Sequence, residues 1–258
     1  MDTLSETSIL SNLKTNFIGQ HIIYFPRLGS TMDAARQRAR EGAAEGTLVI
    51  AEEQTAGRGR RGRSWFSIQG GLAYSIILYP ALFQLPSLVM IASLAIVRSI
   101  ESLTPLHAGI KWPNDVLIDG KKVCGILIES ALKGGTVDFS IVGIGINISG
   151  VLPALSPPAI PATSLSVEVG YEISRLKVLS RSMYEIEQLY LAVRAGRSLV
   201  NEWRQRLVTL GHQVQVEMEG TTLTGIAEDV EEDGSLLLRE ADGKLSRVVA
   251  GDVSLRVV

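Results

Sequence analysis

The chain has 258 residues, of which 46% are apolar and 20% are charged, with a formal net charge of -2. This length and apolar fraction suffice for one substantial core and a small second domain. The weakly acidic balance excludes a globally basic nucleic-acid binder and a polybasic membrane anchor, so any positive site must be local. Cys124 is the only cysteine, which excludes an intrachain disulfide and a multi-cysteine zinc cluster and indicates a reducing, cytoplasmic location.

The N-terminal segment 1–14 carries Asp2 and Glu6 before any basic residue and lacks a long apolar core. It therefore does not fit a secretory signal peptide. No apolar run in the sequence reaches the roughly 18 residues that a membrane-spanning helix needs. We accordingly expect no membrane partner.

The first part of the chain combines strand and helix patterns. β-branched and aromatic runs predict strands, whereas apolar residues at spacings of three and four predict helices. In chain order, the expected elements are a strand at 20–26, a helix capped by Ser30 and ending near Gly42, strands at 47–53 and 71–79, a helix at 85–103, and strands at 109–112, 116–119, 123–132 and 137–148. The Gly/Arg-rich segment 55–67 is therefore expected to be a loop between two strands, and Asp119-Gly120 a hairpin turn.

The second part of the chain begins with a segment, 149–163, in which several prolines forbid regular structure. Two helices are then expected, an amphipathic one over 176–193 and another over 198–210. From His212 onward, short alternating strands with turn signals predict a small β-barrel. The turn signals lie at 219–220, 233–234 and 242–243. We therefore expect two domains, 1–211 and 212–258.

The loop 57–65 (GRGRRGRSW) gathers positive charge. Its four arginines alternate with glycines that let the backbone approach a ligand closely. The spacing is not that of the phosphate-binding G-x-x-x-x-G-K-[ST] loop, so side chains would hold an anion here. Trp65 adds a flat ring suited to stacking on a purine. These features indicate a nucleotide site, although a solvated arginine-rich turn or an unspecific nucleic-acid patch has equal weight on composition alone.

The segment 109–116 (GIKWPNDV) joins two strands through a proline turn. Lys111 therefore lies at a strand end, where the sheet fixes its direction. A compact ammonium suits a carboxylate and a phosphate oxygen together. The alternative is a surface lysine beside an ordinary turn with Trp112 in the core, and the segment by itself favours that alternative.

Five ordered motifs together resemble the biotin protein ligase family. They are Ser30-Thr31-Met32-Asp33, the Gly/Arg loop, the Lys-Trp-Pro-Asn-Asp turn at 111–115, KVCGILIE at 122–129 and VGIGIN at 142–147. The likeness continues into the C-terminal segments 225–229 and 251–256. It implies an α+β fold: a catalytic mixed β-sheet with flanking helices, like that of class II aminoacyl-tRNA synthetases, followed by an SH3-like barrel.

The resemblance also implies a two-step reaction. The biotin carboxylate attacks the α-phosphate of Mg-ATP, and the resulting biotinyl-5'-AMP is attacked by a lysine of a biotin carboxyl carrier protein. Mg2+ would arrive with ATP, so no residue is assigned as a metal ligand, and relatives suggest a homodimer. Only about 20 residues precede the first strand, where bifunctional members carry a helix-turn-helix domain. We therefore expect the ligase-only form, without specific DNA binding.

Site residues follow from the same resemblance. The residues expected to bind biotin are Ser30, Thr31, Met32, Gln54, Arg58, Gly59, Arg60, Lys111 and Gly125. The residues expected to bind ATP or the adenylate are Arg58, Arg60, Arg63, Trp65, Lys111, Asn114, Asp115 and Asn147. Lys111 and Arg58 would be catalytic, because two anions that react with each other need fixed cations beside them. Cys124 is expected to be a small buried strand residue and not a nucleophile.

Two competing functions remain. A lipoate–protein ligase would share the adenylate chemistry but need a longer apolar pocket, and the Gly/Arg loop favours biotin. A non-enzymatic module using the four arginines would bind RNA or DNA in a salt-sensitive way without ATP turnover. The acidic balance of the rest of the chain disfavours this second alternative.

Overall fold

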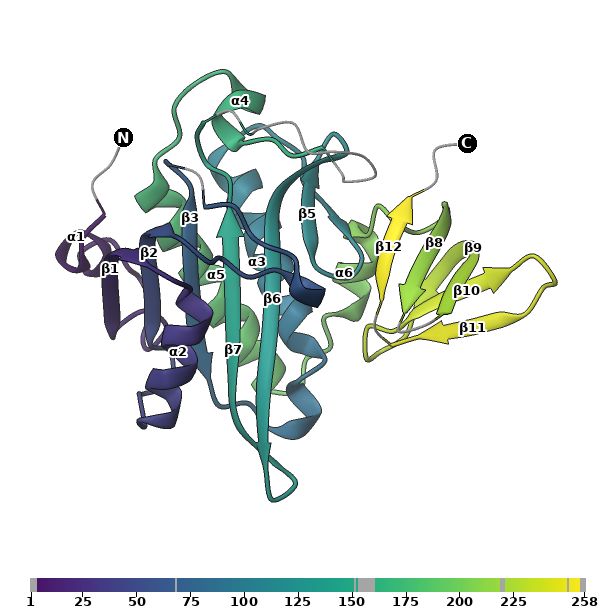
Figure 1. The fold of residues 1–258 in the computed structure, drawn as a ribbon, viewed down its shortest axis with the longest axis horizontal. Helices are drawn as coiled ribbons and strands as arrows, with labels where there is room; N and C mark the ends of the chain where they lie inside the picture. Colours follow the sequence, from purple (N-terminus) through teal and green to yellow (C-terminus); the bar gives the residue numbers. More distant parts are fainter. Residues whose placement is uncertain are drawn as a thin grey trace.

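The computed structural model describes residues 4–67, 69–150, 152, 161–218, 221–249 and 251–255. Its strands form two sheets (Figure 1). A seven-stranded mixed sheet has the order β1-β2-β3-β7-β6-β5-β4, and a five-stranded antiparallel sheet has the order β11-β10-β9-β8-β12. The α+β class, with a mixed sheet and a small C-terminal β-unit, is confirmed. The expected turn at 219–220 and most of the proline-rich segment lie outside the described residues.

The elements have the following bounds. The strands of the large sheet are β1 (Ile22–Leu28), β2 (Leu48–Gln54), β3 (Leu72–Leu78), β4 (Gly109–Lys111), β5 (Asp115–Ile118), β6 (Lys121–Lys133) and β7 (Thr136–Ile146). The helices are α1 (Glu6–Leu10), α2 (Thr31–Arg40), α3 (Ser87–Leu103), α4 (Leu165–Val169), α5 (Arg175–Arg194) and α6 (Val200–Arg206). The small sheet consists of β8 (Gln213–Met218), β9 (Thr221–Val230), β10 (Leu236–Glu240), β11 (Leu245–Val248) and β12 (Asp252–Leu255).

The large sheet is covered differently on its two faces (Figure 1). Side chains alternate between faces along a strand, so Ile144 and Ile146 of β7 pack into the main core with α3 and α5. On the opposite face, Met32 of α2 packs in a smaller cluster with Phe139 and Ile141 of the same strand. Toward the end of β7 this second face carries glycines, which leaves room there for a site.

Helix α6 is shorter than the sequence predicts. The expectation was 198–210, whereas the helix ends at Arg206. Leu207 is extended and bridges Ile110 of β4, and the Val208 N–H donates to the Ile110 carbonyl at 2.9 Å. Pairing with the edge strand β4 thus ends the helix at this point. The five-residue helices α1 and α4 were not predicted, because they are too short to show a periodic pattern.

The two sheets are joined beside the Lys-Trp-Pro-Asn-Asp turn. The Trp112 indole N–H donates to the Gly234 carbonyl in the β9–β10 turn at 2.9 Å, and the Trp112 backbone N–H donates to Thr209 Oγ1 at 2.9 Å. Arg204 of α6 binds Asp229 of β9 at 2.6 Å. The small sheet therefore supports the turn that follows Lys111. None of the described helices is long and apolar enough to cross a membrane.

Candidate functional site

A row of small residues crosses the large sheet on the face where α2 lies. Strand register aligns one residue from each of six strands, and residues paired in this way project from the same face. In order across the sheet, the members of this small-residue row are Ala51, Ala73, Gly145, Gly125, Asp115 and Lys111. The first four carry no more than a methyl group, so they form a flat floor that ends at a carboxylate and an ammonium.

Trp65 lies on this floor. A Cβ atom at Gly145 would be 2.3 Å from Trp65 Cε2, and one at Gly125 would be 3.0 Å from Trp65 Cζ3. The Trp65 backbone N–H donates to the Gly57 carbonyl at 2.9 Å, which holds the residue at the base of the Gly/Arg loop. The two glycines therefore create a surface on which an aromatic ring fits in van der Waals contact.

Lys122 adds a second ammonium to this end of the row. Its Nζ lies 2.6 Å from Asp115 Oδ1 and 5.8 Å from the centroid of the Trp65 ring. Lys111 is itself only 7% exposed, although it is charged. Two lysines and one carboxylate thus come from neighbouring positions at the edge of the floor, and ammonium groups there suit an anion.

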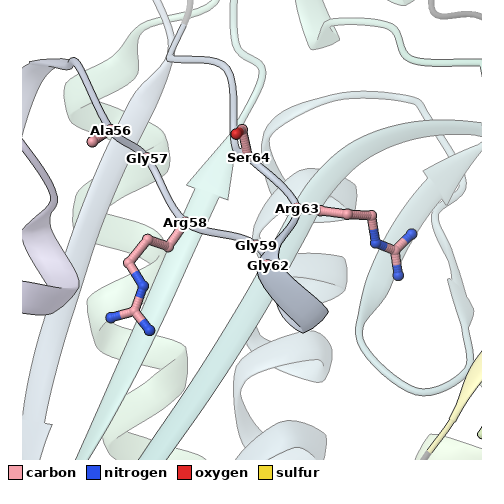
Figure 2. Close-up of a pocket in the computed structure, with 7 residues that line it drawn as sticks. All are labelled: Ala56, Gly57, Arg58, Gly59, Gly62, Arg63 and Ser64. Atoms are coloured by element: carbon pink, nitrogen blue, oxygen red, sulfur yellow. The ribbon is translucent and has the colours of Figure 1, made fainter. Parts of the chain in front are cut away.

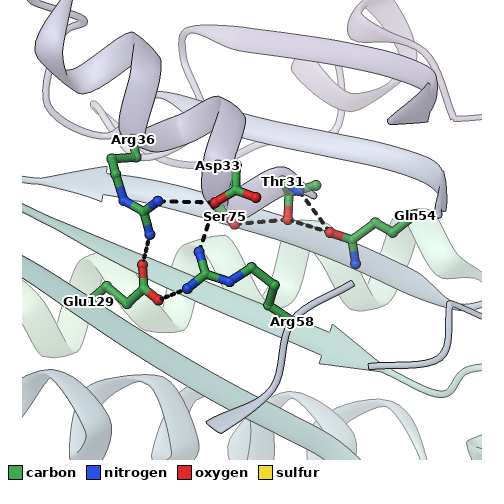
Figure 3. A network of polar contacts seen from close by, with 7 residues as sticks. All are labelled: Thr31, Asp33, Arg36, Gln54, Arg58, Ser75 and Glu129. Atoms are coloured by element: carbon green, nitrogen blue, oxygen red, sulfur yellow. Dashed lines mark hydrogen bonds and ion pairs between the residues drawn. The ribbon is translucent and has the colours of Figure 1, made fainter. Parts of the chain in front are cut away.

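A polar network lies beside the row, where α2 begins (Figure 3). Gln54 Oε1 accepts hydrogen bonds from the backbone N–H and the hydroxyl of Thr31, at 2.8 and 3.0 Å. Ser75 of β3 donates its hydroxyl to Thr31 Oγ1 at 2.9 Å. This network fixes the orientation of two side chains that were predicted to bind a ligand, Thr31 and Gln54.

Ser30 is the residue before α2, as predicted, but its hydroxyl makes no capping hydrogen bond. Ser30 is 3% exposed, and its Oγ finds no hydrogen-bond partner within the described part of the chain. A buried hydroxyl without a partner costs about 1–3 kcal/mol. Such an atom is well suited to hydrogen-bond a ligand.

Met32 follows in the first turn of α2 and is buried. A Cβ atom at Gly143 would lie 2.4 Å from Met32 Sδ, so this glycine makes room for the thioether. Gly143 and Gly145 thus admit two different side chains, Met32 and Trp65, onto one face of β7. Met32 forms part of the wall between α2 and the sheet.

The Gly/Arg loop folds back on itself as a tight turn. The Gly59 N–H donates to the Arg63 carbonyl at 2.7 Å, and Arg61 at the tip has a φ of 54°. A hollow of about 260 Å3 is lined by Ala56, Gly57, Arg58, Gly59, Gly62, Arg63 and Ser64. Figure 2 shows the side chains of Arg58 and Arg63 pointing to opposite sides of the loop. The loop can therefore offer guanidinium groups in two directions.

Two arginines of the loop, Arg58 and Arg60, are already engaged with the body of the protein. Arg58 binds Asp33 at 2.7 Å and Glu129 at 2.6 Å (Figure 3). Arg60 donates to Asn114 Oδ1 at 3.0 Å, which ties the loop to the turn after Lys111. The loop is thus held over the sheet by ion pairs and hydrogen bonds.

The two asparagines predicted to bind ATP, Asn114 and Asn147, lie near the small-residue row. Asn114 donates its side-chain N–H to the Ile126 carbonyl at 2.6 Å and accepts from Arg60, so it braces the turn against β6. Asn147 lies two residues beyond Gly145 and is buried, with its backbone N–H bonded to the Val123 carbonyl. Asn114 is thus held near the row through its side chain, and Asn147 through its backbone.

Several residues of the site had no role assigned from the sequence. They are Asp33, Arg36, Ser75, Lys122, Glu129, Gly143 and Gly145. A signal was present for some of them, since glycine at alternate positions of a strand opens one face, and Lys122 stands at the start of a matched motif. Arg36 and Ser75 carry no such signal.

Cys124 lies next to the site but faces away from it. It is fully buried in the main core, and burial raises the pKa of its thiol far above the ordinary range. The expectation of a small buried strand residue is confirmed. The thiolate required of a nucleophile is therefore not formed at neutral pH.

Comparisons with known proteins point in one direction. The Biotin/lipoate A/B protein ligase family matches residues 24–147, and the Biotin protein ligase C terminal domain matches residues 209–256. The bifunctional ligase/repressor BirA of Bacillus subtilis is 37% identical over 259 aligned positions, which cover 98% of this chain and 79% of that protein. The biotin--[acetyl-CoA-carboxylase] ligase of Mycobacterium tuberculosis is 35% identical, with 87% and 85% covered.

A solved structure is also similar along nearly its whole length. The biotin protein ligase from Aquifex aeolicus, in complex with biotin and ATP, superposes with a TM-score of 0.75 at 30% identity. The match covers 92% of this chain and 99% of that one. The similarity therefore includes both sheets.

Proposed function

The chain belongs to the biotin protein ligase family, and from this premise we propose that it activates biotin with ATP and transfers it to a lysine of a biotin carboxyl carrier domain. The names of its relatives and the biotin and ATP bound to the Aquifex aeolicus protein support this activity. The observation that carries the proposal is the small-residue row. It connects a polar network suited to a ureido group with two lysines suited to a carboxylate.

For biotin, the proposed contacts start at the polar network. Ser30, Thr31 and Gln54 would hydrogen-bond the ureido group. The Ser30 hydroxyl has no hydrogen-bond partner among the described residues, which supports this placement. The apolar ring and chain would pass along the row between Met32 and the Trp65 ring, toward Gly125. The carboxylate would then point toward Lys111 at the end of the row.

For ATP, the proposed contacts come from the loop and from the turn after Lys111. Arg58, Arg60 and Arg63, with the backbone of Gly59, would hold the phosphates. Asn114 and Asp115 would lie beside them, Asn147 would read the adenine, and Trp65 would stack against it. The loop hollow and the Trp65 position on the floor support these contacts.

The proposed chemistry needs no nucleophilic side chain. A biotin carboxylate oxygen attacks the α-phosphorus, the bond to the β-phosphate oxygen breaks, and pyrophosphate leaves with its electron pair. Lys111 and Arg58 stabilise the negative charge that accumulates. Lys122 lies beside Asp115 at the same end of the row, so we assign it the same role. In the second step the neutral amine of the carrier lysine attacks the acyl carbon, AMP leaves, and the amine gives up a proton.

Mg2+ would enter with the nucleotide, because phosphate oxygens are its preferred ligands and supply charge neutralisation there. We further propose a cytoplasmic homodimer, with catalytic residues in 1–211 and a separate C-terminal unit over 212–258. We also propose that the chain has no specific DNA partner; its net charge of -2 gives it no general electrostatic attraction to DNA. The lone buried thiol fits a reducing compartment.

The test is a transfer assay. The protein is mixed with biotin, Mg-ATP and a biotin carboxyl carrier domain, and mass spectrometry is expected to show one added biotinyl group on one lysine. Lipoate in place of biotin, and a carrier with that lysine changed to arginine, are expected to give no addition. If calorimetry detects no heat of binding with biotin, either alone or together with ATP, the proposal is wrong.

A further inference from the structure

Four charged side chains form a closed ring at the edge of the site (Figure 3). Asp33 binds Arg36 at 3.0 Å and Arg58 at 2.7 Å through the same oxygen, Oδ1. Glu129 binds Arg58 through Oε1 at 2.6 Å, and its other oxygen, Oε2, contacts Arg36. Positive and negative groups alternate around the ring, so its formal charge is zero.

The members of this ion ring differ in how they are anchored. Asp33 and Arg36 lie on α2, and Glu129 lies on β6. Arg58 belongs to the Gly/Arg loop. Its side chain is 39% exposed, whereas that of Arg36 is 28% exposed. Because Arg36 contacts both carboxylates by itself, α2 stays connected to β6 when Arg58 leaves.

We propose that Asp33 and Glu129 are positioning residues that hold Arg58 in a resting position, and that an anionic ligand competes with them for the guanidinium. The identity of the anion rests on the proposed function, in which Arg58 meets the biotin carboxylate and the α-phosphate. The ion ring thus sets how readily Arg58 is freed to meet the ligand. Arg36 weakens the attraction of Asp33 and Glu129 for Arg58, because it binds both carboxylates itself and its guanidinium repels that of Arg58.

This arrangement predicts opposite effects from neighbouring substitutions. Glu129→Gln removes one attraction on Arg58, so the loop is released more readily. Arg36→Gln leaves both carboxylates to Arg58 alone, so the loop is held more firmly. Since the ring is partly exposed, each change is expected to be roughly two- to fivefold and to shrink at high salt.

The first measurement needs no ligand. Trypsin cleaves after arginine, so the rate of cleavage within 58–63 reports how often the ligand-free loop is released. Glu129→Gln and Asp33→Asn are expected to be cut faster than the wild type, and Arg36→Gln more slowly. Arg38→Gln is the matched control, because Arg38 lies on the same helix and pairs with Glu41 at 3.0 Å, outside the ring.

The second measurement is calorimetric binding of ATP to the biotin-bound protein. Affinity is expected to rise in Glu129→Gln and fall in Arg36→Gln, with Arg38→Gln unchanged. A merely structural ring would make both substitutions destabilising and move cleavage in the same direction for both. That result, or cleavage rates equal to those of the control, would overturn the proposal.

The two measurements separate this inference from the proposed function. If the wild type bound neither biotin nor ATP, the function would be wrong, and the order of cleavage rates would still decide the role of the ring. If the wild type bound both ligands but the cleavage order failed, only the ion ring proposal would fall.

Discussion

Trp65 and Gly145 are in direct contact, with the indole lying where any side chain on Gly145 would have to be. A Cβ atom there would be 2.3 Å from Cε2 and 2.6 Å from Nε1 of the ring. Real carbon atoms do not approach so closely, so the ring and a larger residue exclude each other. This glycine therefore determines whether the base of the Gly/Arg loop can lie on the sheet.

Gly145→Ala is expected to displace Trp65 and weaken binding of biotin and ATP by tenfold or so. Overpacking of this kind also lowers the free energy of unfolding by about 1–3 kcal/mol. Calorimetry and urea denaturation measure the two effects. Gly29→Ala is the control, because a Cβ atom there meets nothing within 4 Å. Wild-type affinity in Gly145→Ala would contradict the role given to the row.

Trp65 fluorescence is expected to change when ATP binds to the biotin-bound protein. Trp112 and Trp203 are fully buried and hydrogen-bonded through their indole N–H groups, so replacing them would disturb the core. The better control is Trp65→Phe, which leaves both in place. The nucleotide-dependent signal should disappear in this variant, and its persistence would rule out stacking by Trp65.

Lys111→Met and Lys122→Met are each expected to slow biotin-dependent pyrophosphate release by on the order of 100-fold, because each removes a cation from the reacting groups. Methionine keeps most of the length of the lysine side chain without its charge, and circular dichroism checks the fold. Lys121→Met is the neighbouring control, since Lys121 pairs with Glu168 at 2.9 Å on another element. Pyrophosphate release at the wild-type rate in Lys111→Met would remove Lys111 from the mechanism.

Ser30→Ala is expected to weaken biotin binding by roughly 5- to 30-fold while leaving the free energy of unfolding unchanged or slightly higher. The reason is that the buried hydroxyl has no partner among the described residues until a ligand supplies one. Ser182→Ala should behave in the opposite way. Its hydroxyl bonds Tyr74 at 3.0 Å in the core, so stability falls by about 1 kcal/mol and affinity is retained. A marked loss of stability in Ser30→Ala would show that its hydroxyl is structural.

Cys124 is expected to resist alkylation by iodoacetamide from pH 7 to pH 9. Burial raises the pKa of the thiol, so the reactive thiolate is absent across this range in the folded protein. In denaturant the ordinary pKa returns, and labelling becomes fast and rises with pH. Mass spectrometry follows the adduct. Rapid labelling of the native protein would mean that this part of β6 opens to solvent.

Long elements could be predicted from the sequence because their patterns repeat. The helix at 176–193 is observed as Arg175–Arg194, and the strand at 123–132 as Lys121–Lys133. The end of α6 could not be predicted, since it depends on a hydrogen bond between Val208 and Ile110, far apart in the chain. Local propensity does not contain such a contact.

The same distinction applies to the site. The family resemblance grouped Thr31, Gln54, Arg58 and Lys111 as biotin-binding residues, without giving the contacts among them. The alignment of Gly145 with Gly125 depends on strand register, which becomes known only when both strands are placed. The contact between Arg36 and Glu129 joins residues 93 positions apart and could not be predicted from either motif.

The floor of the site owes its shape to glycines, which have no side chain, on strands in the middle of the sheet. β7 is paired on both sides along most of its length, so hydrogen bonds to β3 and β6 hold the backbone at Gly143 and Gly145 in place. The loop above can vary its other residues without altering those spaces, as long as Trp65 stays on Gly145. Substitutions in β7 itself are therefore expected to change the range of accepted acids, with the arginines left as they are.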